Sequence, residues 1–425
     1  MAISKWNKSP LKPLCNRIGD GLHGTPSYND ESDVFFINGN NLKNGSIVIS
    51  RETKKVTSSD FESNYIELNE NSLLLSINGT LGEMAFYNGE KVMLGKSAAY
   101  LNFKTGINRF YYYYFQLKGV QQYFYNVATG STIKNLGLKS IQDFEVPHPD
   151  EKEWQPIARF LSNLDKKIEL NNKINTELEA MAKLIYDYWF VQFDFPDANG
   201  KPYKSSGGKM VFNEALKREI PEGWGVNSLS DWIEADKTGD WGKEKEQGNY
   251  TLEVDCIRGA DINGLNGKGK VKASHRFILQ KNEHKLLVPF DLVVEISGGS
   301  PVQSTGRMAY FTPETLDRFD APLICSNFCK AISLVNTHYF YNFVYQWNSI
   351  YDNGILFGWE GKTSGIKNLL FDSFVSNYNV CLPTETLVKK FYNFVEPLQQ
   401  KKQKALKENS ELESLRDWLL PMLMN

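Results

Sequence analysis

An internal duplication is the feature of this sequence that most constrains its fold. The tetrapeptide Ile-Lys-Asn-Leu occurs at residues 133–136 and again at 366–369, each time close behind small hydroxylated residues. The segments upstream of the two strings also match, and in the same order. The matching pairs are "TLGEMAFYNG" (80–89) with "STGRMAYFTP" (304–313), "NSLLLSINGT" (71–80) with "FDLVVEISGGS" (290–300), and "FFINGNNLKNG" (35–45) with "DCIRGADINGL" (255–265). Because chance rarely preserves order, we infer two copies of one module.

Each copy is followed by a long, charged segment that is poor in glycine. Apolar residues recur three and four positions apart in both segments, which is the spacing of an amphipathic helix that packs against another helix. Asn175 and Asn409 fall at equivalent places near this seam, where a polar residue can fix the register of pairing. The predicted helix-pairing residues are Ile157, Leu161, Leu164, Ile168, Leu178, Met181 and Ile185 in the first segment, and Leu398, Leu406, Leu412, Leu415 and Leu419 in the second.

Two prolines give expectations about where these helices begin. Pro156 is placed for the first turn of the first helix, where a missing backbone N–H costs nothing. Pro397 lies well inside the second segment and predicts a kink or a broken start there.

These patterns predict an α+β protein with two globular α+β modules separated by two long α-helices. The helices are expected to pack as an antiparallel coiled coil, which would relate the modules by a pseudo-two-fold axis. A chain of 425 residues is long enough for two domains. The predicted divisions are a first module at 1–150, a first long helix at 151–195, a linker at 196–210, a second module at 211–383 and a second long helix at 384–425.

Composition argues against several classes of protein. The sequence has no run of about 18 apolar residues, and its start lacks the apolar core of a signal peptide. The 5 cysteines are scattered without zinc-ligand spacing, so we expect packed thiols in a reducing, cytoplasmic protein. The formal net charge of −2 gives no global basic field, although local Lys and Arg side chains can still bind phosphates.

The motifs of common catalytic sites are missing from the sequence. Three stretches rich in glycine and lysine lack the G-x-x-x-x-G-K-[ST] spacing of a phosphate-binding loop. The 5 histidines form no metal or triad pattern. An enzyme with duplicated active sites would need matching acids or bases in both copies, yet Glu83 faces Arg307. We therefore predict a chain with no catalytic residues and no metal site.

Two stretches of the sequence resemble a known family. They are "TGSTIKNLGLKSIQDFEVPHP" with the helical segment "IARFLSNLDKKIELNNKINTELEAMAKLIYDYWFVQFDFP", and "MVFNEALKREIPEGWGVNSLSDW" (210–232). On these motifs the chain resembles a type I restriction-modification specificity subunit over essentially its full length. The resemblance implies a chain that is not itself an enzyme and whose modules are target-recognition domains. Each domain would read one half of a bipartite, asymmetric target in double-stranded DNA.

The resemblance also implies partners. The two helices would set the spacing between the half-sites and dock two methyltransferase subunits. Restriction and translocase subunits would join in the full complex. No cofactor is expected in this chain, because S-adenosylmethionine and ATP would bind to the partner subunits.

Side chains that could contact DNA are sought in the duplicated loops. Base edges are read by Arg, Lys, Asn and Gln, and phosphates are held by Lys, Arg, Ser and Thr. The candidates in the first module are Asn38, Lys43, Asn78, Thr80, Lys96, Ser97, Ser131, Thr132 and Lys134. The candidates in the second module are Arg258, Lys268, Lys270, Lys272, Gln303, Ser304, Arg307, Lys362, Ser364 and Lys367.

Other interpretations compete with DNA contact. Loops rich in Gly, Asn, Ser and Lys are commonly plain solvated turns. The repeated Ile-Lys-Asn-Leu is expected to join each module to its helix, with Ile133, Leu136, Ile366 and Leu369 in the core. The aromatic runs at 109–127 and 338–351 are expected to be core helices with some tyrosine hydroxyls exposed, rather than platforms for stacked bases. A coiled-coil adaptor that binds proteins without reading DNA is the alternative function.

Overall fold

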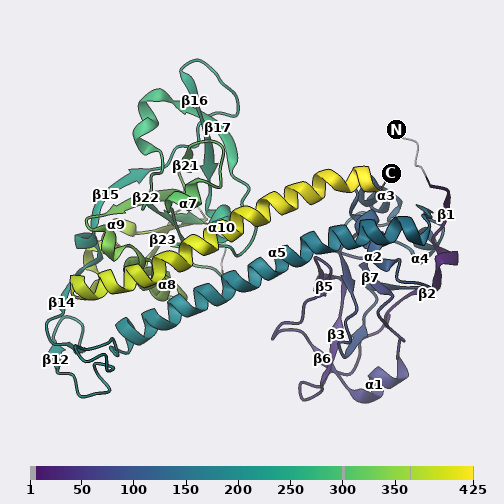
Figure 1. The fold of residues 1–425 in the computed structure, drawn as a ribbon, viewed down its shortest axis with the longest axis horizontal. Helices are drawn as coiled ribbons and strands as arrows, with labels where there is room; N and C mark the ends of the chain where they lie inside the picture. The colour runs from purple at the N-terminus through teal and green to yellow at the C-terminus, as the bar shows by residue number, and fades with distance from the viewer. Residues whose placement is uncertain (1–5, 299–301, 364, 425) are drawn as a thin grey trace. The chain divides into compact units, whose positions relative to one another are not determined.

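The computed structural model describes residues 6–298, 302–363 and 365–424. The chain forms two compact units. The first unit contains Met1–Ile168 and Glu411–Asn425, and the second contains Glu169–Ser410. Each unit therefore consists of one globular module and a segment of each long helix (Figure 1).

The first unit is built on a four-stranded antiparallel sheet with strand order β2-β10-β7-β8. The same unit also contains a three-stranded sheet of order β6-β3-β9, in which β3 and β9 are parallel. The strands are β1 (Lys8–Pro10), β2 (Cys15–Asp20), β3 (Val34–Ile37), β4 (Leu42–Lys43), β5 (Ser46–Ile47), β6 (Lys55–Val56), β7 (Ser72–Ser76), β8 (Met84–Phe86), β9 (Val92–Leu94), β10 (Ala98–Phe103) and β11 (Glu145–Pro147). The helices are α1 (Ser58–Ser63), α2 (Asn108–Gln116), α3 (Lys118–Val127) and α4 (Leu138–Gln142), with short 3-10 turns η1 (Lys12–Leu14) and η2 (Gly39–Asn41).

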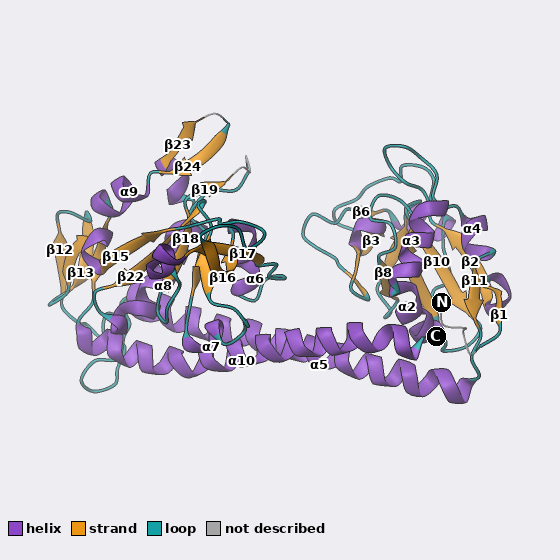
Figure 2. Ribbon diagram, turned by 90° about the horizontal axis from the view of Figure 1, so that it is seen from above, coloured by secondary structure: helices purple, strands orange, loops and turns teal. Residues whose placement is uncertain are grey.

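The second unit repeats this plan with the sheet order β15-β22-β18-β20. Its other strand groups are β17-β16-β21, β19-β24-β23, β14-β25 and β12-β13 (Figure 2). The strands are β12 (Met210–Asn213), β13 (Arg218–Pro221), β14 (Gly225–Ser228), β15 (Ile233–Thr238), β16 (Tyr250–Ile257), β17 (Ser274–Leu279), β18 (Leu292–Glu295), β19 (Ser297–Gly298), β20 (Met308–Tyr310), β21 (Leu323–Cys325), β22 (Cys329–Leu334), β23 (Glu360–Thr363), β24 (Ile366–Leu369) and β25 (Asn379–Leu382). The helices are α6 (Ile262–Leu265), α7 (Pro313–Leu316), α8 (Phe340–Asp352) and α9 (Phe371–Asn377), with turns η3 (Asp187–Val191), η4 (Leu229–Trp232), η5 (Gly259–Asp261), η6 (Gln280–Lys285), η7 (Thr337–Tyr339) and η8 (Ile355–Trp359).

The predicted duplication is confirmed at the level of individual residues. Ile37 and Ile257 both end strands that pair in parallel, with Leu94 and Cys325 respectively. The glycines that follow them at matching positions are packed tightly. A Cβ at Gly39 would collide with Ser76, and one at Gly259 would collide with Glu295. These closely packed glycines explain why the turn after this strand was retained in both copies.

The two long helices are α5 (Glu151–Tyr186) and α10 (Glu385–Leu423). Their segments run antiparallel within each unit, as predicted. In the first unit Arg416 Nη1 donates to Asp165 Oδ1 at 2.8 Å. In the second unit Asn171 Nδ2 donates to Asn409 Oδ1 at 2.9 Å, and the rings of Tyr186 and Phe391 lie 6.0 Å apart. The chain order of these contacts is reversed between the helices, which defines the antiparallel direction.

The expectation for Pro156 was wrong, and Pro397 does not break the second long helix. The first long helix begins at Glu151, so Pro156 is inside it rather than in its first turn. The second long helix runs from Glu385 to Leu423 without interruption at Pro397.

The predicted pairing residues differ in burial. Leu161, Ile168, Leu178 and Leu406 are buried. A second group is half-buried at the edge of the seam, namely Ile157, Leu164, Ile185, Leu398, Leu412 and Leu419. Met181 and Leu415, however, are 48% and 41% exposed. Placing these two in the seam was wrong, because apolar spacing does not identify which of two neighbouring helical stripes faces the partner helix.

Polar residues that the apolar pattern overlooked are buried between the helices and the second module. Gln399, Lys402 and Gln403 are 1%, 3% and 1% exposed. Lys402 Nζ donates to Glu179 Oε2 at 2.7 Å. Burial disfavours both charges, yet Lys402 holds the pKa of Glu179 below its ordinary value, and Tyr310 together with Glu179 holds the pKa of Lys402 above its ordinary value.

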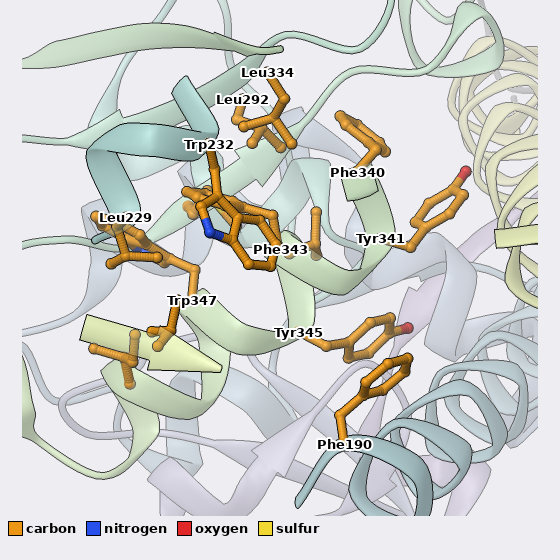
Figure 3. Close-up of a cluster of buried hydrophobic side chains, with 14 of the residues drawn as sticks. Phe190, Leu229, Trp232, Leu292, Leu334, Phe340, Tyr341, Phe343, Tyr345 and Trp347 are labelled. Atoms are coloured by element: carbon orange, nitrogen blue, oxygen red, sulfur yellow. The ribbon is translucent and has the colours of Figure 1, made fainter. Parts of the chain in front are cut away.

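The aromatic runs form core helices, as expected. Tyr111 and Trp347 are fully buried, and Figure 3 shows Trp347 with Phe343 and Trp232 in the second core. Their tyrosine hydroxyls also attach the modules to the long helices. Tyr113 Oη donates to Asp165 Oδ2 and Tyr341 Oη donates to Glu396 Oε2, each at 2.6 Å. These two hydroxyls make internal hydrogen bonds and are not exposed.

The predicted linker at 196–210 is packed against the second unit. Just before it, the ring of Phe195 stacks on Trp224, with centroids 5.5 Å apart, and on Tyr203 at 4.6 Å. Asp194 accepts hydrogen bonds from the backbone N–H and hydroxyl of Ser205. The segment is therefore ordered against the module that follows it. No helix in the described part of the chain is long and apolar enough to cross a membrane.

Asn175 is a buried amide whose side-chain nitrogen and oxygen both lack a hydrogen-bond partner. The duplication explains why. Asn171 bonds Asn409, so one turn further along α5 Asn175 is expected to face Ala405. Ala405 occupies in α10 the place that Asn171 occupies in α5. Divergence of the repeat thus kept the Asn171–Asn409 pair and lost the equivalent pair at Asn175.

We predict opposite effects from two similar substitutions at these positions. Asn175→Leu removes unsatisfied polar atoms and should raise the free energy of unfolding by about 1–2 kcal/mol. Asn171→Leu removes the donor to Asn409 Oδ1 and should lower the free energy of unfolding by about 1–3 kcal/mol, although Asn409 Nδ2 keeps its bond to Asn172 Oδ1. Urea unfolding of the full-length chain measures both. Destabilisation by Asn175→Leu as large as that by Asn171→Leu would contradict the assignment.

Candidate nucleic-acid interface

In each module, two loops meet where a central strand of the large sheet ends. In the first unit the backbone N–H of Leu136 donates to Ile77 O at 2.8 Å, just after β7. In the second unit the N–H of Leu369 donates to Ile296 O at 2.9 Å, just after β18. The repeated Ile-Lys-Asn-Leu therefore closes the same loop junction in both copies.

The asparagine just before the leucine of each string also makes a side-chain hydrogen bond at this junction. Asn78 Nδ2 lies 3.4 Å from Asn135 Oδ1 in the first unit. Ser297 Oγ donates to Asn368 Oδ1 at 2.6 Å in the second. Asn135 bridges to both Asn78 and Thr129, so the junction brings the predicted candidate Asn78 next to the loop that precedes the string.

Apart from Asn78 and Lys134, which are half-buried, the first-module candidates fall into two groups. Two of them hold the backbone: Ser97 Oγ donates to Asn38 Oδ1 at 3.0 Å and accepts from the N–H of Gly39 at 2.9 Å. These two side chains shape the loop and have little capacity left for DNA. The exposed candidates are Lys43, Thr80, Lys96, Ser131 and Thr132.

The second-module candidates divide in the same way. Arg258 is tied to Asp261 at 3.1 Å and to Lys272 O at 2.8 Å, and Ser304 is only 4% exposed. The exposed candidates are Lys268, Lys270, Lys272 and Gln303. Ser364 and the side chain of Lys362 lie outside the described residues.

Arg307 is bound beneath the loop rather than presented on it. Its Nε and Nη2 donate to the two carboxylate oxygens of Glu295 at 2.8 and 2.7 Å, and both side chains are largely buried. Hydrogen bonding to Glu295 raises the pKa of Arg307 above its ordinary value. In the first module Ser76 and Glu83 occupy the matching places, so the support beneath the loop differs between the copies. The sequence could not show this pairing, because Glu295 ends strand β18 whereas Arg307 lies just before strand β20.

In the repeated string the leucine is buried as expected, but the isoleucine faces solvent instead of the core. Leu136 and Leu369 are buried, at 0% and 6% exposure. Ile133 and Ile366 are 61% and 43% exposed, so placing them in the core was wrong. The hairpin of β23 and β24 also lies on the side of the second unit away from α10 in Figure 2. The string therefore does not form the joint to the helix there; the tyrosine contacts do.

The intervening lysines lie over aromatic rings. Lys134 Nζ is 5.1 Å from the ring centre of Tyr125, and Lys367 Nζ is 5.1 Å from that of Phe357. Both distances are within the range of a cation–π interaction. Lys367 is also paired with Glu360, whose carboxylate lies 3.1 Å away. Sequence reasoning missed Tyr125 and Phe357, because neither is adjacent to its lysine in the chain.

The described residues hold no group of three or more His, Cys, Asp and Glu side chains that could bind a metal ion. The five cysteines are free thiols and all are buried. Burial raises the pKa of Cys15, Cys256 and Cys329 to about 12, so these thiols stay protonated at neutral pH.

Comparison with known proteins shows which family the first part of the chain matches. The family model described as "Type I restriction modification DNA specificity domain" matches residues 3–180. The specificity subunit of the type I restriction enzyme MjaIX from Methanocaldococcus jannaschii is 26% identical over 322 residues, covering 75% of this chain and 68% of that protein. The HindI specificity subunit from Haemophilus influenzae is 35% identical over 75 residues, covering 17% of this chain and 16% of that protein.

A solved structure shows the same fold. The crystal structure of the type I restriction-modification S subunit from M. genitalium superimposes with a TM-score of 0.60 at 16% identity, covering 100% of this chain and 98% of that one. The family match at residues 3–180, the relatives and the duplicated modules on paired helices agree with one another. The chain thus contains a type I restriction modification DNA specificity domain at residues 3–180, and over most of its length it is similar to type I restriction enzyme specificity subunits.

Proposed function

We propose that each module of this chain reads one half of a bipartite, asymmetric DNA target. The observation that carries this proposal is a shared frame with different loop side chains. Both modules have the same sheet order and the same loop junction, but Glu83 stands where the second module has Arg307. Two copies of one scaffold with different loops suit two different half-sites.

The proposal includes two equivalent docking surfaces for methyltransferase subunits. In the second unit Met181 and Leu184 on α5 and Tyr188 in the π-helical turn η3 are 48%, 66% and 36% exposed, and their spacing of three and four places them on one helix face. Each has a counterpart 234 residues later on α10, in the first unit. These counterparts, Leu415, Trp418 and Met422, are 41%, 66% and 52% exposed.

Exposed apolar residues kept at equivalent positions support binding of two copies of one partner. Phe160 and Phe394 extend the pattern, since they are also equivalent and are 45% and 39% exposed. This arrangement accounts for Met181 and Leu415 facing outward rather than into the seam. In the proposed complex the partners would carry S-adenosylmethionine and ATP, and restriction and translocase subunits would join for cleavage.

Co-expression with the methyltransferase of the same system tests the reading function. Methylation of the host DNA, mapped by single-molecule sequencing, should reveal a split motif with a spacer of fixed length and adenine modified in both halves. A stable complex that leaves no sequence-restricted methylation would instead support a protein-binding adaptor.

The docking surfaces are tested by the number of methyltransferases bound. Leu184→Glu and Trp418→Glu should each reduce the complex from two methyltransferases to one, because a buried unpaired charge is costly at an apolar contact. Native mass spectrometry counts the subunits. Leu170→Glu is the matched control, since Leu170 is 52% exposed on α5 but its counterpart is Lys404. Loss of both methyltransferases from either single variant would refute two independent surfaces.

A further inference from the structure

The first unit contains a large cavity between its globular module and the last turns of α10, which lie beside α3 in Figure 1. Its volume is about 1200 Å³, and its lining includes Tyr123 and Phe144 from the module and Leu420 and Pro421 from α10. The cavity in the second unit that lies beside Tyr186 of α5 has a volume of only about 200 Å³. The larger cavity has room for several side chains at once.

The duplication shows that these two cavities occupy the same place in the two units. Met84 lines the first cavity, and its counterpart Met308 lines the second. Leu420 lines the first cavity, and Tyr186, which is its counterpart 234 residues earlier, lines the second. The difference in volume therefore reflects what fills the same place in each unit.

In the second unit this place is filled by residues that follow α5, including the hairpin of β12 and β13. Tyr186 packs in one core cluster with Phe193 and with Ile220 of the hairpin. Burial raises the pKa of Tyr186 and of Tyr378, and the nearby charge of Arg218, also in the hairpin, opposes the rise in both. The hairpin thus lies against both tyrosines.

The counterparts of these two tyrosines face the cavity in the first unit. Leu420 corresponds to Tyr186 by its position on the helix. Phe144 corresponds to Tyr378 by a shared hydrogen bond: the N–H of Leu11 donates to Phe144 O at 3.0 Å, and the N–H of Leu229 donates to Tyr378 O at 3.2 Å. Both Phe144 and Leu420 line the large cavity.

The described part of the first unit has no counterpart of the hairpin. Trp224 follows the hairpin and corresponds to Trp6, with which the described residues begin. Equivalent apolar positions are therefore covered by a peptide segment in one unit and line a cavity in the other. The second unit thus shows what kind of group suits the cavity, which is a short segment of polypeptide with apolar side chains.

The proposed docking surface on α10 adjoins the rim of the cavity. Pro421 lies at this rim, three residues after Trp418, which is 66% exposed, and residues three apart are neighbours on a helix. At the equivalent rim of the second unit, Lys183 Nζ and Asp187 Oδ2 form an ion pair at 2.5 Å. A partner docked at Trp418 is therefore next to an open cavity, whereas a partner docked on the second unit meets a bridged rim.

We propose that the methyltransferase docked on the first unit inserts an apolar segment into this cavity, against Phe144 and Leu420. The segment covers in trans the positions that the hairpin of β12 and β13 covers within the second unit. The two helix surfaces are equivalent, but the first unit holds its methyltransferase by an additional contact. This assignment rests on the proposed function and adds a difference between its two docking sites.

Photo-crosslinking in the full complex tests the occupant directly. The photoreactive residue p-benzoylphenylalanine replaces Tyr123, which lines the large cavity, or Tyr351, which lines the small one. The variant at Tyr123 should crosslink to one segment of the methyltransferase, identified by mass spectrometry, and the variant at Tyr351 should not. Four results would overturn the inference. They are no crosslink from Tyr123, a crosslink within the chain, a crosslink to a second copy of the chain, and equal crosslinking from both positions.

A substitution that fills the cavity measures what the contact contributes to affinity. Gly119 lines the cavity, and a Cβ added there meets no atom within 4 Å, so Gly119→Trp adds an indole without a clash. In the Leu184→Glu background, which keeps the methyltransferase on the first unit, it should weaken binding roughly tenfold. In the Trp418→Glu background it should change nothing. Gly137→Trp is the matched control, since its Cβ also meets open space and Gly137 lies outside the cavity lining.

The outcomes separate this inference from the proposed function. Unchanged affinity of Gly119→Trp in the Leu184→Glu background, or an equal loss in both backgrounds, would contradict insertion into the cavity. A complex that keeps two methyltransferases in both background variants would instead contradict the proposed docking surfaces. In that case the crosslink from Tyr123 still decides whether a methyltransferase segment occupies the cavity.

Discussion

The antiparallel pairing of α5 with α10 is the interaction on which the rest of the structure depends. Two partly buried ion pairs join the helices, Asp165 with Arg416 and Glu179 with Lys402. Both acids lie on α5 and both bases lie on α10. The charges therefore favour contact between the two different helices over contact between identical ones. Because each unit contains a segment of both helices, neither module has a complete core without this pairing.

Duplication and divergence are visible at different depths of the molecule. The sheet order, the closely packed Gly39 and Gly259, and the loop junctions are the same in both units. The side chains at and beneath the exposed loops, such as Glu83 and Arg307, and part of the seam between the helices have diverged. The amide of Asn175 is unpaired because of such a change in the seam: the position of α10 that is equivalent to Asn171 is Ala405, which cannot bond it.

The repeat, the α+β class and the paired helices could be predicted from sequence, because order and periodicity are properties of the chain itself. The direction in which individual side chains point could not be predicted from the sequence. Ile133 was expected in the core from its residue type, yet a loop can turn an isoleucine outward. The burial of Lys402 was not predicted, because apolar periodicity describes a single helix. It does not show that the second module also packs against that helix. Arg307 was expected to face DNA, but Glu295 on a neighbouring strand binds it.

Residues from the far end of the chain complete the core of the first unit. Leu420 and Met424 pack there with Trp154 and Leu161. During synthesis this module therefore emerges from the ribosome long before the residues that cover its helix-facing side. Apolar surface around Trp154 stays open while the second module is still being made, a state that is prone to misassembly. The pairing of distant helices thus makes maturation of the first module a late event.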